Sequence, residues 1–328
     1  MRAIVIEKQG GPEVMQVAEV DAPRPGPGEV AVDVEAAGVN FIDIYQRGGA
    51  YPVPTPFTPG VEAAGTVAEV GEGVTGVAVG DRVAWVMVPG AYAERAVVPA
   101  DRTVPVPDGV TTEQAAAVLL QGLTAHYLTY STYPVQQGDT VVVHAAAGGT
   151  GLLLVQLAKA RGARVIGTVS TEAKEALARE AGADDVIRYG TDDGAERPDI
   201  AAAVRTLTGG AGAAAVYDGV GAATFEASLD SLRLRGTLAL FGQSSGKVAP
   251  VDPQRLNTAG SVYLTRPMLV HYIADRAELL ERASDIFGLV ASGGLDVRIG
   301  GRYPLADAAR AHEDLASRRT TGKLVLTA

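Results

Sequence analysis

The chain has 328 residues, a formal net charge of -10, and 47% hydrophobic residues. This length exceeds one typical hydrophobic core and predicts two domains, while the composition excludes a disordered chain. The acidic balance argues against nucleic acid or an anionic membrane surface as a partner, because both need clustered Lys and Arg. The sequence has no cysteine and no apolar run near the about 18 residues that span a bilayer, so we expect a cytoplasmic protein.

The first third of the chain is rich in strands and turns. It enters a strand-like run from its first residues, so no signal peptide is expected. Residues 29–36 alternate polar and apolar side chains, which is the period of a half-buried strand. Further short strands are predicted at 65–71 and 80–86, and the proline-rich stretches 23–28 and 51–60 are predicted to be loops. This part is therefore predicted to be a mostly β domain.

From about residue 111 onward, predicted helices and strands alternate. A helix is predicted from Thr112, where a capping residue precedes strong helix formers. Strands are then predicted at 141–144, 164–169, 185–187, 214–218 and 237–241. Helices are predicted between them at 150–161, 172–181 and 224–232. This alternation predicts an α/β fold with a doubly wound (Rossmann) parallel sheet.

The end of the chain does not continue the alternation of strands and helices. A helix is predicted at 276–292, and the last strand, 323–326, has no α/β partner near it in the sequence. We therefore expect this strand to pair in the N-terminal β domain, which makes that domain discontinuous. The predicted domains are a mostly β domain of residues 1–123 and 266–328 and a cofactor domain of residues 124–265.

A glycine loop lies between the first predicted strand and helix of the cofactor domain. Ala146-x-Gly148-x-x-Gly151 is a relaxed dinucleotide fingerprint in which Ala replaces the first Gly. The strand before it and the helix after it supply the context for binding a pyrophosphate at a helix N-terminus. The alternative is an ordinary strand-to-helix turn. The predicted cofactor contacts in this loop are Gly148, Gly149, Thr150 and Gly151.

The tip of the next strand indicates which dinucleotide binds. An NAD site places a carboxylate there, about 20 residues after the glycines. This strand ends instead in Ser170 and Thr171, Lys174 follows one turn later, and Tyr189 ends the third strand. Hydroxyls and an ammonium suit a 2′-phosphate, so we predict NADPH. Alternatively, Lys174 is a solvated helix charge.

Two more segments are predicted to contact the cofactor. Phe241, Gly242 and Ser244 follow the fifth strand, at the edge where doubly wound sheets bind ligands. Arg318 is a candidate partner of a cofactor phosphate, with a surface role as the alternative.

The chain resembles the medium-chain dehydrogenase/reductase superfamily and, within it, the zinc-independent quinone oxidoreductases of the zeta-crystallin-like group. The resemblance covers nearly the whole chain and is carried by the segments 37–43, 59–65, 121–126, 144–151 and 217–221. It implies an NADPH-binding Rossmann domain beside a GroES-like catalytic domain.

The resemblance also bears on metal binding. Zinc enzymes of the superfamily place a Cys ligand where this chain has Asn40 and a His ligand where it has Val61. Glu62 remains, but one carboxylate does not make a tetrahedral zinc site. The four histidines are scattered along the sequence, so no metal is predicted.

The resemblance implies a set of catalytic residues. They are Asn40, Asp43, Tyr45, Tyr51 and Arg266. Asn40 and Thr124 are also expected near the nicotinamide. Packing is the alternative role for the two tyrosines, and capping of a turn is the alternative for Asp43. Gln243 departs from the family, in which Asn is common at that position.

Without a metal as Lewis acid, the substrate should already be electrophilic. We therefore expect an NADPH-dependent quinone oxidoreductase, with reduction of the C=C bond of an enone or enoyl thioester as the alternative. A non-enzymatic NADPH-binding protein with a structural or regulatory role is the alternative of a different class. The apolar segment 261–264 is expected at a sheet edge, which the family covers by forming a homodimer.

Overall fold

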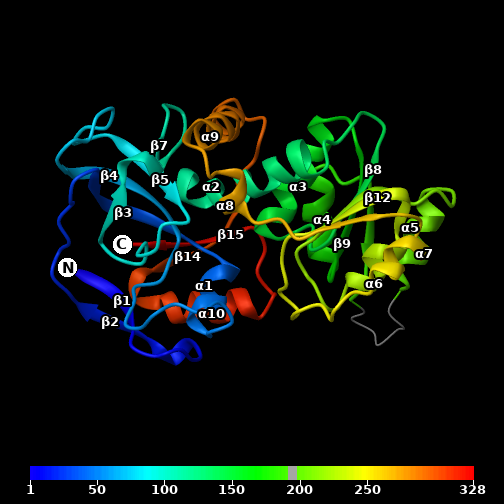
Figure 1. Cartoon of the computed structure of the whole chain (residues 1–328), viewed down its shortest axis with the longest axis horizontal. Coiled ribbons are helices and arrows are strands. Elements are labelled where there is room, and N and C mark those ends of the chain that lie inside the picture. The colour runs from blue at the N-terminus through cyan, green and yellow to red at the C-terminus, as the bar shows by residue number, and fades with distance from the viewer. Residues whose placement is uncertain (191–197) are drawn as a thin grey trace. The chain divides into compact units, whose positions relative to one another are not determined.

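The computed structural model describes residues 1–190 and 198–328, which form two compact units (Figure 1). We call Met1–Leu123 with Ile273–Ala328 the β unit, and Thr124–Tyr272 the α/β unit. Residues 266–272, predicted to belong to the β domain, group with the α/β unit instead. The reason is local packing: the Tyr272 ring stacks on Tyr127 with 4.1 Å between centroids, and its hydroxyl accepts a hydrogen bond from Thr132 at 3.0 Å.

The β unit is built on a mainly antiparallel sheet. Its strands are β1 (Arg2–Ile6), β2 (Met15–Glu19), β3 (Glu29–Val39), β4 (Glu62–Val70), β5 (Arg82–Val86), β6 (Arg95–Pro99), β7 (Thr103–Pro105), β14 (Ile299–Pro304) and β15 (Lys323–Thr327). Its helical elements are η1 (Pro12–Val14), α1 (Phe41–Arg47), η2 (Ala100–Arg102), α9 (Arg276–Ala291), η4 (Leu305–Asp307) and α10 (Ala308–Ala316), and α2 (Thr112–Tyr127) begins here and ends in the α/β unit. The sheet order is β14-β15-β3-β4-β5-β7, β6 also pairs with β3, and β1 pairs with β2.

The last strand of the chain closes this sheet. β15 pairs antiparallel with β3, and Leu324 lies opposite Val39 in the register. The expected return of the C-terminal strand to the N-terminal domain is therefore confirmed. The same register continues one residue further and brings Lys323, the first residue of β15, to Asn40, the residue that precedes α1.

The α/β unit is a parallel sheet flanked by helices (Figure 1). Its strands are β8 (Thr140–Val143), β9 (Arg164–Val169), β10 (Asp185–Arg188), β11 (Ala213–Asp218), β12 (Leu232–Leu240) and β13 (Tyr263–Thr265). Its helices are η3 (Leu128–Thr132, one π turn), α3 (Gly149–Ala160), α4 (Glu172–Glu180), α5 (Ile200–Leu207), α6 (Phe225–Asp230), α7 (Pro253–Thr258) and α8 (Leu269–Tyr272). The order β10-β9-β8-β11-β12-β13, parallel throughout, confirms the predicted doubly wound sheet. The strand order reverses between β8 and β11, which is where such sheets bind ligands.

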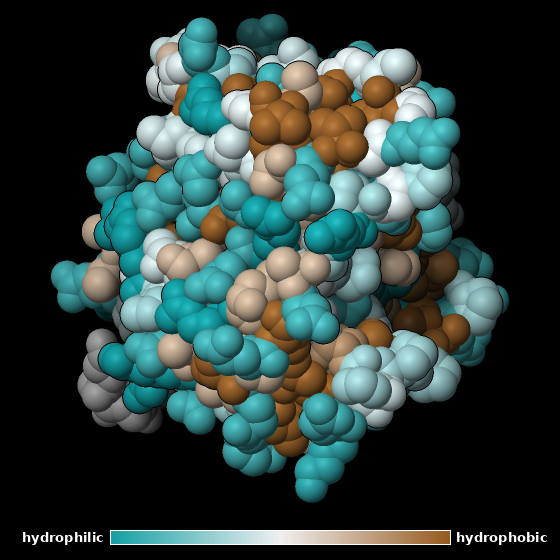
Figure 2. Space-filling view, turned by 90° about the vertical axis from the view of Figure 1, so that its left-hand side faces the viewer, coloured by the Kyte–Doolittle hydropathy of each residue, from teal (hydrophilic) through white to brown (hydrophobic). Residues whose placement is uncertain are grey.

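The surface agrees with the acidic, mixed composition. Figure 2 shows a face on which hydrophilic residues predominate and hydrophobic residues form separate patches. Within the ranges that the structure covers, no helix has both the length and the apolar character needed to cross a bilayer.

A chain of buried polar side chains crosses the core of the β unit. The Asp43 Oδ2 atom accepts hydrogen bonds from the Tyr92 hydroxyl and the Asn40 backbone N–H, both at 2.9 Å. His312 joins Tyr92 to Arg47, with its Nε2 atom 3.1 Å from the Tyr92 hydroxyl and its Nδ1 atom 3.2 Å from Arg47 Nη1. Because guanidinium only donates, Nδ1 accepts and Nε2–H donates, which makes His312 a neutral ring. Burial and the nearby Arg47 lower the pKa of His312 to about 3, in agreement with this assignment.

The carboxyl group of Asp43 is only partly hydrogen-bonded in this network. Its Oδ1 atom is buried and has no hydrogen-bond partner among residues 1–190 and 198–328. Burial raises the pKa of this carboxyl from 3.8 to about 7, although its hydrogen bonds from Tyr92 and Asn40 oppose the shift. The folded state therefore holds the Asp43 proton more tightly than the unfolded chain does.

This difference predicts a pH-dependent stability. The contribution of Asp43 is fully present below pH 3.8 and is lost as the pH rises through about 7. At about 1.4 kcal/mol per pKa unit, we expect an effect on the order of 4 kcal/mol at most. Asp43→Asn removes the titration, so urea unfolding from pH 4 to pH 8 should show the wild type losing stability relative to the variant. Parallel pH profiles of the two proteins would contradict this expectation.

Candidate functional site

The predicted cofactor loop lies at the carboxyl end of β8. Gly148 is the N-cap of α3 and offers no side chain to cap its first turn, so the backbone N–H groups there are available to an anion. Gly148, Gly149 and Thr150 are partly exposed, whereas Gly151 is buried. A Cβ atom on Gly151 would lie 2.2 Å from the Ala145 carbonyl oxygen. Gly151 therefore permits close packing of α3 on the loop, and the three residues before it form the open face.

The tip of β9 presents a cation and a hydroxyl. Lys174 Nζ lies 3.5 Å from Ser170 Oγ, and both residues are partly exposed. Thr171 caps α4, since its Oγ1 accepts from the Lys174 N–H at 3.3 Å. Of the two carboxylates nearby in sequence, Glu172 is exposed and lies 3.9 Å from Arg188, and Glu175 pairs with Arg179 at 2.9 Å. This chemistry fits a ribose 2′-phosphate better than a free 2′-hydroxyl. Tyr189, which directly follows β10, is also partly exposed.

Backbone hydrogen bonds connect the loop after β11 to the loop after β12. The Phe241 N–H donates to the Asp218 carbonyl at 2.8 Å, and the Ser244 N–H donates to the Gly219 carbonyl at 3.3 Å. A Cβ atom on Gly219 would come within 2.8 Å of the Phe241 ring. Phe241, Gly242 and Ser244 are partly exposed at this edge of the sheet.

A buried network holds these loops in place. One oxygen of Asp218 accepts from the backbone N–H groups of Val220 and Gly221, and the other accepts from Ser228 and Thr224. His144 Nε2 lies 3.0 Å from Ser228 Oγ, and its Nδ1 lies 2.9 Å from Thr168 Oγ1. Since Ser228 gives its single proton to Asp218, His144 Nε2–H is the donor to Ser228. Burial lowers the pKa of His144, which favours the neutral ring.

In the β unit, the side chain of Asn40 is fully occupied. Its Oδ1 accepts from Gln121 Nε2 at 2.5 Å and from Lys323 Nζ at 2.8 Å. Its Nδ2 donates to the Gly38 carbonyl and to Glu62 Oε2, both at 3.1 Å. Both lone pairs and both protons of the amide are therefore used inside the unit. This geometry fits a positioning role for Asn40, and the direct contact that the family resemblance implies stays a prediction.

The other predicted catalytic residues are more dispersed. Asp43 is fully buried and caps α1, which fits its alternative role as a cap. Tyr45 and Tyr51 are partly exposed, with ring centroids 5.3 Å apart, so they form a pair. Arg266 lies in the α/β unit, is exposed, and donates to the Pro267 carbonyl at 3.3 Å.

The remaining cofactor candidates also divide between the units. Thr124 is buried within α2, in the α/β unit, whereas Arg318 is exposed after α10, in the β unit, with φ at 59°.

Several residues that shape the site were missed by sequence reasoning. Lys323 and Tyr92 had no predicted role, His312 was expected only to be structural, and Gln121 and Asp218 lay in segments that matched the family without a role of their own. The one sequence signal for Lys323 is its place at the start of a strand expected to return to the β domain.

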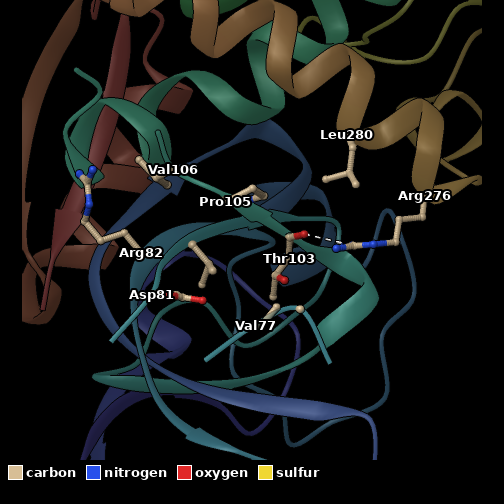
Figure 3. Close-up of a pocket in the computed structure, with 10 residues that line it drawn as sticks. Val77, Asp81, Arg82, Thr103, Pro105, Val106, Arg276 and Leu280 are labelled. Atoms are coloured by element: carbon tan, nitrogen blue, oxygen red, sulfur yellow. Dashed lines mark hydrogen bonds between the residues drawn. The ribbon is translucent and has the colours of Figure 1, made fainter. Parts of the chain in front are cut away.

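A pocket of about 450 Å³ in the β unit has none of these residues in its lining (Figure 3). Arg276 reaches across it from α9 to the Thr103 carbonyl at 3.1 Å, and Arg82 donates to the Val110 carbonyl at 2.9 Å. Val77, Pro105 and Leu280 supply apolar walls. Its charged groups already have protein partners, and none of the predicted site residues lines it.

The surroundings of Glu62 differ from a metal site. Lys323 Nζ lies 2.5 Å from Glu62 Oε2, and the neighbouring Val61 has an aliphatic side chain. Within residues 1–190 and 198–328, no group of three or more His, Cys, Asp or Glu is arranged to hold a metal. The absence of a metal remains a prediction, which the occupation of Glu62 by an ammonium supports.

Comparison with known proteins identifies the family. Residues 26–108 match the family model of the alcohol dehydrogenase GroES-like domain, and residues 149–285 match that of the zinc-binding dehydrogenases. The chain is 47% identical to a quinone oxidoreductase of Pseudomonas aeruginosa, over 97% of this chain and 96% of that one. It is 42% identical to a 2-haloacrylate reductase of Burkholderia sp., over 99% and 98% of the two chains.

Solved structures agree with these matches. A mycobacterial protein solved in complex with NADPH is 54% identical, with a TM-score of 0.95 and full coverage of both chains. The chain therefore belongs to the quinone oxidoreductases of the medium-chain dehydrogenase/reductase superfamily.

Proposed function

We propose that this protein is an NADPH-dependent quinone oxidoreductase. The observation that carries the proposal is the tip of β9, where Lys174 and Ser170 stand in place of the carboxylate of an NAD site, on a doubly wound sheet. The similar mycobacterial structure contains NADPH, which supports the same cofactor here. The cysteine-free sequence supports a cytoplasmic location.

When bound, NADPH supplies the hydride, and a hydride plus a proton convert a quinone to a hydroquinone. The residues of the chain bind and orient the reactants. The open loop of Gly148, Gly149 and Thr150 suits the pyrophosphate, and Ser170 with Lys174 suits the 2′-phosphate. The phenols of Tyr45 and Tyr51 are the proposed donors to the developing oxyanion. Orientation and exclusion of water are then the main contributions of the protein.

Reduction of an activated C=C bond is the second candidate. The 42% identity to a 2-haloacrylate reductase over nearly the full length favours it. Both substrates are electrophiles that accept a hydride without a metal Lewis acid, so the same scaffold suits either.

A substrate panel tests the proposed function. We expect the purified protein to oxidise NADPH with simple quinones and to use 2-haloacrylate, enones and enoyl thioesters more slowly, measured as loss of absorbance of NADPH. Turnover with the C=C substrates alone would replace the quinone proposal by the second candidate. Binding of NADPH without turnover of any substrate would favour a non-enzymatic role.

Lys174→Ala tests the cofactor preference. Loss of one charge-assisted hydrogen bond is worth about 1.5–3 kcal/mol, so the KM for NADPH should rise about tenfold or more while that for NADH stays nearly unchanged. Lys159→Ala is the matched control, because Lys159 pairs on the surface with Asp184 at 2.7 Å. Equal increases for the two cofactors would remove Lys174 from the 2′-phosphate site.

We also propose a homodimer that covers the edge of the parallel sheet. β13 ends the strand order, as expected for segment 261–264, and Tyr263 is 63% exposed there. Leu234, on the neighbouring strand β12, is 76% exposed. An uncovered apolar edge favours pairing with another strand.

Light scattering after size-exclusion chromatography checks the dimer. The wild type should have twice the mass of one chain, and Tyr263→Asp should shift it toward a monomer because a buried charge opposes the interface. Val79→Asp is the control, since Val79 is similarly exposed, at 64%, but lies in the β unit. A monomeric wild type would refute the proposal.

A further inference from the structure

Lys323 is an internal ammonium with every proton used. Its side chain is only 4% exposed. Nζ donates to Glu62 Oε2 at 2.5 Å, to Asn40 Oδ1 at 2.8 Å and to Gln121 Oε1 at 2.8 Å. Three oxygen atoms from three separate elements therefore converge on one cationic nitrogen.

The partners of Lys323 are themselves fixed. Glu62 is fully buried, and its Oε1 accepts from the Leu120 N–H of α2 at 2.6 Å. Gly38 makes room for this carboxylate, since a Cβ there would lie 2.2 Å from Glu62 Oε2 and 2.7 Å from the Ala116 carbonyl. The site is thus built into the packing of β3, β4, β15 and α2.

The elements that meet at Lys323 also carry predicted site residues. Asn40 immediately precedes α1, which contains Tyr45. Gln121 lies on α2, three residues before Thr124, the predicted nicotinamide contact. An apolar side chain at the start of β15 would satisfy the strand pairing equally well, so the pairing alone does not require a buried ammonium.

We propose that Lys323 is a tethered cation that positions Asn40, Gln121 and the turn of α2 around Leu120 for hydride transfer. It is a positioning residue, because its three protons are used within the β unit. The inference rests on the proposed oxidoreductase function. The proposed role requires a cation with several N–H donors at the place where Asn40 Oδ1, Glu62 Oε2 and Gln121 Oε1 converge.

Chemical rescue tests this requirement. Lys323→Ala removes the ammonium and leaves room for an alkylammonium ion. We expect kcat with a quinone to fall about a hundredfold, the loss that small misplacements of reacting groups cause. Propylammonium chloride, present during refolding and assay, should restore kcat at least tenfold and raise the melting temperature of the cofactor-free variant.

Two controls isolate the hydrogen-bonding cation. Tetramethylammonium chloride has the same charge but no N–H donor, so it should restore neither quantity. Lys159→Ala removes a lysine of the surface pair with Asp184 and should respond to neither salt. A folded Lys323→Ala protein with wild-type kcat, or one whose loss of kcat propylammonium does not reduce, would overturn the proposal.

A double variant separates positioning from stability. Lys323→Met with Glu62→Gln removes both charges of the pair, so the melting temperature should recover relative to Lys323→Met alone. If the cation positions the site, kcat stays low in the double variant. Recovery of kcat together with stability would show that only charge balance matters and would overturn the proposal.

The experiment also distinguishes this inference from the proposed function. Failure of the proposed function appears as a wild type without quinone turnover, while the melting temperature of cofactor-free Lys323→Ala still rises with propylammonium alone. Failure of the inference appears as normal wild-type turnover without any propylammonium-specific effect on the variant.

Discussion

The buried pair of Lys323 and Glu62 is the constraint on which the β unit depends. Removing two ions from water costs several kcal/mol for each, and the cost is offset only when their remaining hydrogen-bonding groups are satisfied. Here Asn40, Gln121 and the Leu120 N–H satisfy them. These contacts are made in the register in which Leu324 of β15 lies opposite Val39 of β3, so the carboxylate has its ammonium partner only when the last strand of the chain is paired.

The α/β unit also contains a buried carboxylate whose oxygens are hydrogen-bonded, in this case by neutral groups. Asp218 is fully buried, and two backbone N–H groups and two hydroxyls surround its oxygens. His144 extends this network from α6 to β8 and β9 through Ser228 and Thr168. The carboxylate holds the turn at 219–221, and the carbonyls of Asp218 and Gly219 accept from the N–H groups of Phe241 and Ser244, so the core fixes the edge of the sheet at which ligand binding is proposed.

Sequence periodicity revealed the elements but not these networks. The alternation of strands and helices is local, so the doubly wound sheet could be predicted, and β15 was assigned to the β domain because it lacked a nearby partner. The contact between Lys323 and Asn40 spans 283 residues, and that between Tyr92 and His312 spans 220. Neither follows a 2.0 or 3.6 period, since burial of a polar residue is decided by a partner elsewhere. For the same reason the sequence did not reveal that the Asn40 amide is saturated within the protein.

The pair also limits the chemistry that the site can perform. A metal with an open coordination position polarises a substrate oxygen directly. The Lys323 ammonium has no proton left to do this, because all three are donated to Glu62, Asn40 and Gln121. A cation of this kind orients its neighbours without activating the substrate. The proposed substrates, a quinone or an activated C=C bond, are electrophilic before they bind and therefore suit a site in which Lys323 acts only by orientation.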